Sequence, residues 1–222
     1  MISLCSNIEK EFNEIASTYE TNRLSSWYKA HGEIILNVLD PHQNGTILDI
    51  GCGTGWLLRQ VAKSYQNIKG IGIDISSKMI DIAEEEACRE NIDNLSFIKC
   101  DWEELDLSVL KGENINTVVC ASTFHYFADP IRASKRIFET LTKGGRLLLL
   151  ERDKADSILT HTWAVLHRFL IRDHVRFYLS HELIQFFESV GFSDVSIKRK
   201  LKKLFWKRKF YTSLVLISGK KP

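Results

Sequence analysis

The chain has 222 residues, of which 44% are hydrophobic and 26% charged, a balance typical of a globular domain. No apolar stretch approaches the roughly 20 residues needed to cross a bilayer, and the first ten residues lack the basic and apolar regions of a secretory signal. The five cysteines are odd in number and form no C-x-x-C pair, which argues against a disulfide framework or a zinc site. These features predict a cytoplasmic location.

Apolar residues along the chain recur with helical and strand-like spacing in turn. Residues 8–39 have helical spacing. The helical stretch is predicted to end at Asp40-Pro41, because proline excludes helix continuation. Strands are predicted at 46–50, 68–74, 95–100, 116–122 and 146–151, with helices at 55–65, 76–91 (N-cap Ser76 or Ser77) and 129–145 (opened by Asp129-Pro130). A helical insert to about residue 178, a helix at 180–192 and strands at 194–200 and 209–219 complete the chain. Because apolar strands alternate with helices, we predict one domain with a parallel sheet covered on both faces.

Three glycines at alternate positions follow the first predicted strand, in the sequence ILDIGCGTG. Glycine loses more conformational entropy on folding than any other residue, so the backbone there must gain a tight turn or a close approach to a ligand. The G-x-G-x-G spacing of Gly51, Gly53 and Gly55 differs from the G-x-G-x-x-G turn that admits a pyrophosphate. Asp49, two residues before the first glycine, suits a cationic ligand better.

Carboxylates are predicted at the ends of the next two strands. Asp74 ends the second strand, 19 residues after Gly55, where a carboxylate accepts hydrogen bonds from ribose hydroxyls. Asp101 follows the third strand beside Trp102 and is placed to accept from an adenine amino group. Either aspartate alone could be an ordinary helix N-cap. Since ligands of doubly wound sheets bind outside the carboxyl ends of the strands, both carboxylates and the glycines are predicted to line one crevice.

Five successive motifs carry a family resemblance: LDIGCGTG, IGIDISSKMI, FIKCDWEEL, VVCASTFHYFADP and LTKGGRLLLLE. They resemble those of class I S-adenosylmethionine-dependent methyltransferases, most closely the small-molecule branch that includes ubiquinone and menaquinone biosynthesis enzymes. The resemblance covers 12–151 well. It implies an α/β, doubly wound, Rossmann-like sheet of seven strands, in the order 3-2-1-4-5-7-6 with the last strand antiparallel. It also implies a single domain over 1–222, with an N-terminal helical cover at 1–44 and a helical lid insert at 152–179.

The resemblance implies S-adenosyl-L-methionine as the cofactor and S-adenosyl-L-homocysteine as the product. The cofactor-binding residues that it implies are Asp49, Gly51, Cys52, Gly53, Gly55, Asp74, Ile75, Met79, Asp101, Trp102 and Cys120. Asp49 would act on the methionine ammonium, for which the Cys120 carbonyl would be an acceptor. Asp74 would hold the ribose. Ile75 and Met79 would sandwich the adenine, or they are plain core residues.

Three side chains are candidates for the chemical step. A sulfonium methyl is already activated, so the protein mainly aligns the nucleophile and excludes water. A base helps only when the nucleophile carries a proton that must leave. His125 and Glu151, after the fourth and fifth strands, are candidate bases, although His125 could instead shape the pocket. Tyr19, in a segment that resembles the part of the family that closes over the cofactor, would face the sulfonium or the acceptor, or pack between helices.

The predicted insert is rich in cationic side chains. Within it, residues 159–178 contain one acid, Asp173, against His161, His167, His174, Arg168, Arg172 and Arg176. One interpretation is a lid that recognises a carboxylate, phosphate or phenolate, and the other is an amphipathic helix with a solvated basic face. No metal site is predicted, because His167 and His174 would lie two helical turns apart.

The segment 198–210 carries eight basic residues, predicted to lie in the connection between the last two strands. From Val195 onward there are ten Lys and Arg and no acid, which leaves 20 basic and 28 acidic residues before it. Three explanations remain open: protection of an exposed strand edge, weak contact with an anionic membrane, and binding of RNA phosphates. Nucleic acid ranks last, because the rest of the chain is net negative.

The first functional hypothesis is a methyltransferase that acts on an O, N or C atom of a small-molecule acceptor. No Asn/Asp-Pro-Pro-Tyr sequence follows the fourth strand, so an amino group of a nucleic-acid base is a poor acceptor. The alternatives are an RNA or protein methyltransferase that uses the basic C-terminus, and a non-catalytic module that binds the cofactor. The sequence indicates neither the acceptor nor the oligomeric state.

Overall fold

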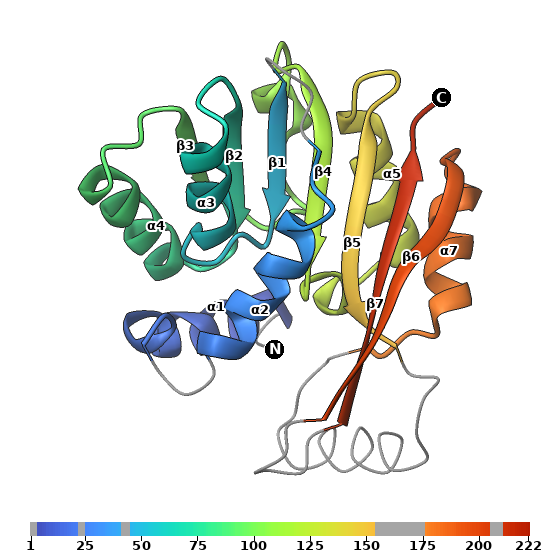
Figure 1. Ribbon diagram of the computed structural model, residues 1–222, viewed down its shortest axis with the longest axis horizontal. Helices are drawn as coiled ribbons and strands as arrows, with labels where there is room; N and C mark the ends of the chain where they lie inside the picture. The colour runs from blue at the N-terminus through green and yellow to red at the C-terminus, as the bar shows by residue number, and fades with distance from the viewer. Residues whose placement is uncertain (1–3, 22–24, 41–44, 154–175, 205–210) are drawn as a thin grey trace.

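The computed structural model describes residues 4–21, 25–40, 45–153, 176–204 and 211–222. Its strands are β1 (Thr46–Ile50), β2 (Lys69–Asp74), β3 (Leu95–Lys99), β4 (Ile115–Ala121), β5 (Arg146–Arg152), β6 (Ser193–Leu204) and β7 (Tyr211–Lys220). They form one sheet in the order β3-β2-β1-β4-β5-β7-β6 (Figure 1). Neighbours from β3 to β5 are parallel, and β7 is antiparallel to both β5 and β6. The predicted strand order and the antiparallel last strand are confirmed.

The helices lie before, between and after the strands. The helices described are α1 (Leu4–Ile15), α2 (Ser25–Leu36), α3 (Trp56–Ser64), α4 (Ser77–Arg89), α5 (Pro130–Thr140) and α7 (Ser180–Ser189). The short 3-10 helices are η1 (Ala16–Thr18), η2 (Leu107–Leu110) and η3 (Phe124–Tyr126). The stretch 8–39 with helical spacing thus contains two helices, α1 and α2, which lie across the lower end of the sheet, where β1 points (Figure 1).

Side-chain caps set where the chain turns from strand into helix. Ser76 is the N-cap of α4, and its Oγ accepts a hydrogen bond from the Met79 backbone at 3.1 Å. Asp129 is the N-cap of α5 and accepts from the backbones of Ile131 and Arg132. Both caps confirm the predictions, because a Ser or Asp oxygen at this position satisfies amide groups that have no partner within the helix.

The core occupies both faces of the sheet. Alternate residues of β5 take part in different clusters, because successive side chains of a strand point to opposite faces. Leu147 and Leu149 belong to the cluster that includes side chains of α5 and α7, whereas Leu148 and Leu150 belong to the cluster that includes α2 and α3. This double burial explains why the strand sequence is almost wholly apolar.

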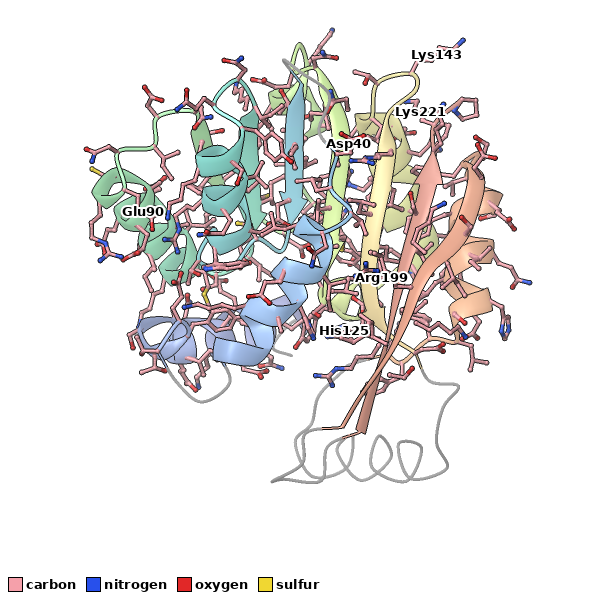
Figure 2. All side chains as sticks on the ribbon, in the orientation of Figure 1. Asp40, Glu90, His125, Lys143, Arg199 and Lys221 are labelled. Carbon is pink, nitrogen blue, oxygen red and sulfur yellow. The ribbon has the colours of Figure 1, made fainter. Side chains whose placement is uncertain are left out.

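The basic segment 198–210 corrects one prediction. Because β6 pairs with β7 as far as Leu204, residues 198–204 lie in a strand and not in the connection; residues 205–210 lie outside the described residues. Figure 2 marks Arg199 on this strand. Since β6 is the last strand of the sheet, its cations lie along an edge where positive charge opposes pairing with another chain. In the described parts of the chain, no helix is both long and apolar enough to span a bilayer.

Candidate active site

The carboxyl ends of the five parallel strands surround a cavity of about 200 Å³, together with α1, α2 and the residues between them. The sequence-predicted residues that line it are Tyr19, Asp49, Gly51, Cys52, Gly53, Asp74, Ile75, Met79, Asp101, Trp102 and His125. They come from segments far apart in the chain, which the crossover connections of a doubly wound sheet bring to one end.

The glycine turn is fixed against the neighbouring strand. The amides of Gly51 and Cys52 donate to the carbonyl of Ile73 in β2, at 2.8 and 3.1 Å. Gly51 has a φ of +74°, and a Cβ added there would lie 2.1 Å from Oγ1 of Thr123. Only glycine therefore fits at position 51, where the chain passes close to the segment that follows β4.

Gly53 and Gly55 both have a positive φ, but Gly53 lies beside the cavity and Gly55 packs against a neighbouring strand. A Cβ on Gly53 would have Tyr19 Cε1 as its nearest neighbour, at 3.7 Å, so the space beside Gly53 is open to the cavity. A Cβ on Gly55 would lie 2.7 Å from the ring of Phe97, and Gly55 does not line the cavity. The predicted ligand contact at Gly55 is thus replaced by close packing of α3 against β3.

Asp74 connects the glycine turn to α4. One carboxylate oxygen accepts from the Gly53 amide at 2.8 Å, and the other accepts from the Ser76 amide at 2.9 Å. Burial raises the pKa of Asp74, and these amide bonds partly offset the rise. Because an ionised carboxylate has about four acceptor positions, Asp74 can still accept from ligand hydroxyls.

Asp49 is a second carboxylate in the same cavity, and it is buried, with only 3% of its surface exposed. Burial, and then the negative charge of Asp74, raise the pKa of Asp49 to about 7. A positive group bound in the cavity would remove much of the cost of ionising Asp49. The pair of carboxylates therefore favours a cationic ligand.

Asp101 and Trp102 lie beyond the end of β3. An Asp101 oxygen accepts from the Glu103 amide at 2.9 Å, which holds the carboxylate in a tight turn. The Arg136 guanidinium lies 5.4 Å from the Trp102 ring centroid and donates to the Trp102 carbonyl at 2.9 Å. Met79 is fully buried and lines the cavity, so it can both pack in the core and contact a ligand.

His125 and Glu151 form a buried pair, of which His125 lines the cavity. Nδ1 of His125 lies 2.8 Å from a Glu151 oxygen, and the second oxygen accepts from the Phe124 amide at 2.8 Å. Burial alone would raise the pKa of Glu151, but the charge and hydrogen bond of His125 hold it below its ordinary value. His125 lines the cavity and Glu151 does not, so Glu151 acts through the imidazole. Figure 2 marks His125 at the lower end of the sheet.

Cys120 is the remaining predicted cofactor residue, and its side chain is fully buried in the core of β4. The cavity is lined instead by the next residues, Ala121 and Ser122.

The basic insert cannot be compared in the same way, since 154–175 lies outside the described residues. Arg176 is described: it is exposed, and its amide donates to the His125 carbonyl at 3.1 Å. No group of three potential metal ligands occurs in the ranges that the structure describes.

Several lining residues were not predicted. They are Ile8, Phe12, Glu20, Lys29, His31, Trp56, Ser122, Thr123 and Arg152, among others. His31 is buried in α2, and its Nδ1 lies 2.7 Å from the Ser122 hydroxyl. Arg152 could have been predicted from the alternation of side chains along β5, because successive side chains of a strand point to opposite faces of the sheet. This alternation places the Arg152 side chain on the face that α2 covers.

Comparisons with known proteins agree with this geometry. The sequence profile of the family described as "Methyltransferase domain" matches residues 41–207. Demethylmenaquinone methyltransferase of Porphyromonas gingivalis is 26% identical over 180 residues, which cover 75% of this chain and 72% of that protein. Malonyl-acyl-carrier-protein O-methyltransferase of Priestia megaterium is 28% identical over 144 residues, which cover 64% of this chain and only 49% of that protein.

A solved structure shows the same fold. Phosphoethanolamine N-methyltransferase 2 of Haemonchus contortus, in complex with phosphomonomethylethanolamine and S-adenosylhomocysteine, superposes with a TM-score of 0.81. The match covers 100% of this chain and 61% of that chain, at 16% sequence identity.

Proposed function

Since the chain belongs to the methyltransferase domain family and its cofactor is S-adenosyl-L-methionine, we propose that it methylates a small molecule whose nucleophilic atom must lose a proton. The observation that supports this acceptor chemistry is the buried pair of His125 and Glu151 in the wall of the cavity. An acceptor whose nucleophile carries no proton would need no such pair.

The residues present fit the cofactor. Two carboxylates, the buried Asp49 and the partly buried Asp74, share the cavity, and the cofactor carries an ammonium and a sulfonium. The space beside Gly53 leaves room for a ligand against the backbone. Asp49 and the glycine turn would hold the amino-acid part, Asp74 the ribose, and Asp101 with Met79 the adenine. When bound, the cofactor supplies a methyl group already activated by the positive sulfur.

His125 is the proposed base. Glu151 holds Nδ1 of His125, which leaves Nε2 to take the proton of the acceptor. Because Glu151 is buried and its pKa is lowered, it remains ionised and stabilises the imidazolium that forms. Glu151 is therefore a positioning residue. Tyr19 lines the cavity from the N-terminal cover and would exclude water from the reacting atoms.

The names of the relatives support a small or carrier-linked acceptor, demethylmenaquinone in one case and a malonyl-acyl-carrier protein in the other. The comparisons give no support to RNA or protein methylation or to a non-catalytic module.

The four described cysteines, Cys52, Cys88, Cys100 and Cys120, are free thiols, which supports a reducing cytoplasmic location. Contact of the basic edge with an anionic membrane stays a proposal, and a lipophilic acceptor would suit it.

Incubation with methyl-labelled cofactor and separated cell fractions tests the proposal. We expect label in the fraction of small molecules and none in purified RNA or in protein. Label confined to RNA or protein would overturn the acceptor class. No transfer to any fraction, despite tight cofactor binding, would favour the non-catalytic module.

Cofactor binding should depend on pH through Asp49. The pKa of Asp49 in the folded protein is about 7, above its ordinary value of 3.8, so the protonated form predominates below pH 7. Since a cationic ligand prefers the ionised form, affinity should fall by about tenfold per pH unit below 7 and level off above 8. Calorimetric titration from pH 5.5 to 8.5 measures this slope. Asp49→Asn should bind weakly at every pH, and a wild-type slope in this variant would exclude Asp49 as the group responsible.

Gly53→Ala and Gly55→Ala should separate ligand contact from packing. Both variants place a side chain at positive φ, which costs about 1–2 kcal/mol of unfolding free energy. Gly55→Ala should lose about 1–3 kcal/mol more, because its Cβ overlaps the Phe97 ring. Gly53→Ala should instead weaken cofactor binding more strongly. Denaturant titration and calorimetry measure the two effects, and the opposite ranking in both would contradict the assignment.

A further inference from the structure

Glu103 is a buried acid of the cavity wall to which the proposed function gives no role. It lies in the turn that follows β3, and only 7% of its surface is exposed. One of its carboxylate oxygens accepts from the backbone amide of Ala128 at 2.6 Å, and the other accepts from that of Asp129 at 2.9 Å. Hydrogen bonds to an ionised group are roughly twice as strong as neutral ones, so Glu103 holds two distant segments of the chain firmly together.

The backbone of Glu103 belongs to the cofactor end of the cavity. Its amide donates to a carboxylate oxygen of Asp101 at 2.9 Å. The amides of Glu104 and Leu105 donate to the Asp101 carbonyl at 3.0 and 2.9 Å, which closes the turn 101–105 around this residue. Asp101 is proposed to contact the adenine of the cofactor. A ligand bound to the Asp101 carboxylate would therefore also fix the position of Glu103.

The two amides that Glu103 holds lie directly after η3, the short helix that carries His125. Before the imidazole, the amide of Phe124 donates to Glu151 at 2.8 Å, and Glu151 also contacts Nδ1 of His125. The segment with the proposed base is thus held by a carboxylate at each end, Glu151 at its start and Glu103 at its finish. Because the chain between these two points is short, both affect where the imidazole lies.

Helix α5 holds the same turn from the other side. Arg132 donates to the Glu103 carbonyl at 2.9 Å. Arg136 donates to the carbonyls of Trp102 and Leu105. The turn after β3 and the segment from η3 into α5 are therefore joined in both directions by hydrogen bonds. Such a network can carry energetic coupling between two parts of a site.

We propose that Glu103 is a positioning residue that couples cofactor binding to the placement of His125. A cofactor bound at Asp101 fixes the turn 101–105, and the Glu103 carboxylate passes this restraint to the segment that carries the base. This inference rests on the proposed function, because it takes Asp101 as a cofactor contact and His125 as the base. It implies that the base reaches its working position only when the methyl donor is bound.

Nuclear magnetic resonance of protein with isotope-labelled histidine tests the proposal, with S-adenosylhomocysteine as the probe. The His125 signal is identified by its absence from His125→Gln. We expect saturating S-adenosylhomocysteine to move this signal in the wild type. In Glu103→Gln most of that movement should be lost, because a glutamine side chain has one acceptor oxygen for two backbone amides. Calorimetric affinity for S-adenosylhomocysteine should stay near that of the wild type, which also shows that the variant is folded.

The controls separate coupling from a purely structural role. Glu104→Gln changes the next residue of the turn, whose side chain is 71% exposed, and should respond to S-adenosylhomocysteine as the wild type does. Glu103→Asp keeps the charge but is too short to hold both amides, so it should keep part of the response, and it replaces Glu103→Gln if that variant does not fold.

Three results would overturn the coupling: a His125 signal that does not move in the wild type, a full response in either Glu103 variant, or loss of S-adenosylhomocysteine binding in both. The second would assign Glu103 to the structure of the turn alone, and the third would assign it to the cofactor site itself. Failure of the wild type to bind S-adenosylhomocysteine would instead overturn the proposed function.

Discussion

Replacing Arg59 with methionine should lower the free energy of unfolding by about 3 kcal/mol or more. Arg59 lies in α3 with 2% of its side chain exposed and contacts three carboxylates, those of Glu20, Glu86 and Glu90. Its removal leaves these partly buried acids close together with less positive charge to balance them. Figure 2 marks Glu90, the C-cap residue of α4. Because Glu20 also lines the cavity, the same substitution should loosen the N-terminal cover.

The loss of unfolding free energy in Arg59→Met should depend on pH. Burial alone would raise the pKa of Glu90, but Lys63 and Arg59 lower it below its ordinary value of 4.5. The ion pair therefore stabilises the fold above that value, and its contribution is lost as the pH falls through the lowered pKa. Denaturant titrations at pH 7 and pH 3.5 should show a large difference between variant and wild type at the first pH and a smaller one at the second.

Arg89→Met is the matched control. Arg89 also pairs with Glu86, but 70% of its side chain is exposed, so its loss should cost far less than the loss of Arg59. Equal losses for Arg59→Met and Arg89→Met would show that burial of Arg59 adds nothing to the strength of the network.

Replacing His125 with glutamine should lower kcat about 10²–10⁴-fold, once an acceptor is identified. Glutamine can still bond to Glu151 but cannot accept a proton at neutral pH, so the change removes the base and keeps most of the packing. Cofactor affinity should change little. The increase of kcat with pH in the wild type should be absent in the variant.

Glu151→Gln and His181→Gln are the companion variants. Glu151→Gln should shift the pH profile of kcat and lower kcat by less than the loss of His125, because it removes the charge that positions and stabilises the imidazole. His181 is exposed in α7, and its replacement should leave kcat unchanged. A wild-type pH profile in His125→Gln would show that His125 only shapes the pocket.

The sequence predicted the cofactor end of the cavity better than the acceptor end. Gly51, Gly53 and Asp74 follow directly from the strand ends, because the carboxyl ends of parallel strands lie at one edge of the sheet whatever the details of packing. Gly55 was assigned to the ligand by its glycine spacing and the family resemblance, and the Cys120 carbonyl by the resemblance. The packing of Phe97 and the burial of β4 decide their environment, and neither is visible in local spacing.

Long-range geometry explains what the sequence did not predict at the acceptor end. His31 and Ser122 are 91 positions apart and become neighbours only because α2 packs on the sheet. His125 and Glu151 were each predicted as candidate bases, but their division of roles depends on which side chain lines the cavity. The predicted strand at 194–200 was too short: residues 201–204 were left to the connection, whereas they continue β6, the edge strand of the sheet.

Asp74 is the residue on which cofactor binding should depend most, because it joins the glycine turn to α4 and faces the cavity. Calorimetric titration of S-adenosylmethionine should show tight binding to the wild type and a loss of about 1.5–3 kcal/mol in Asp74→Ala. Asp129→Ala, which removes a carboxylate that also accepts two backbone amides but lies outside the cavity wall, should bind as the wild type does. Unchanged affinity in Asp74→Ala, or no binding to the wild type, would contradict the assignment of this cavity to the cofactor.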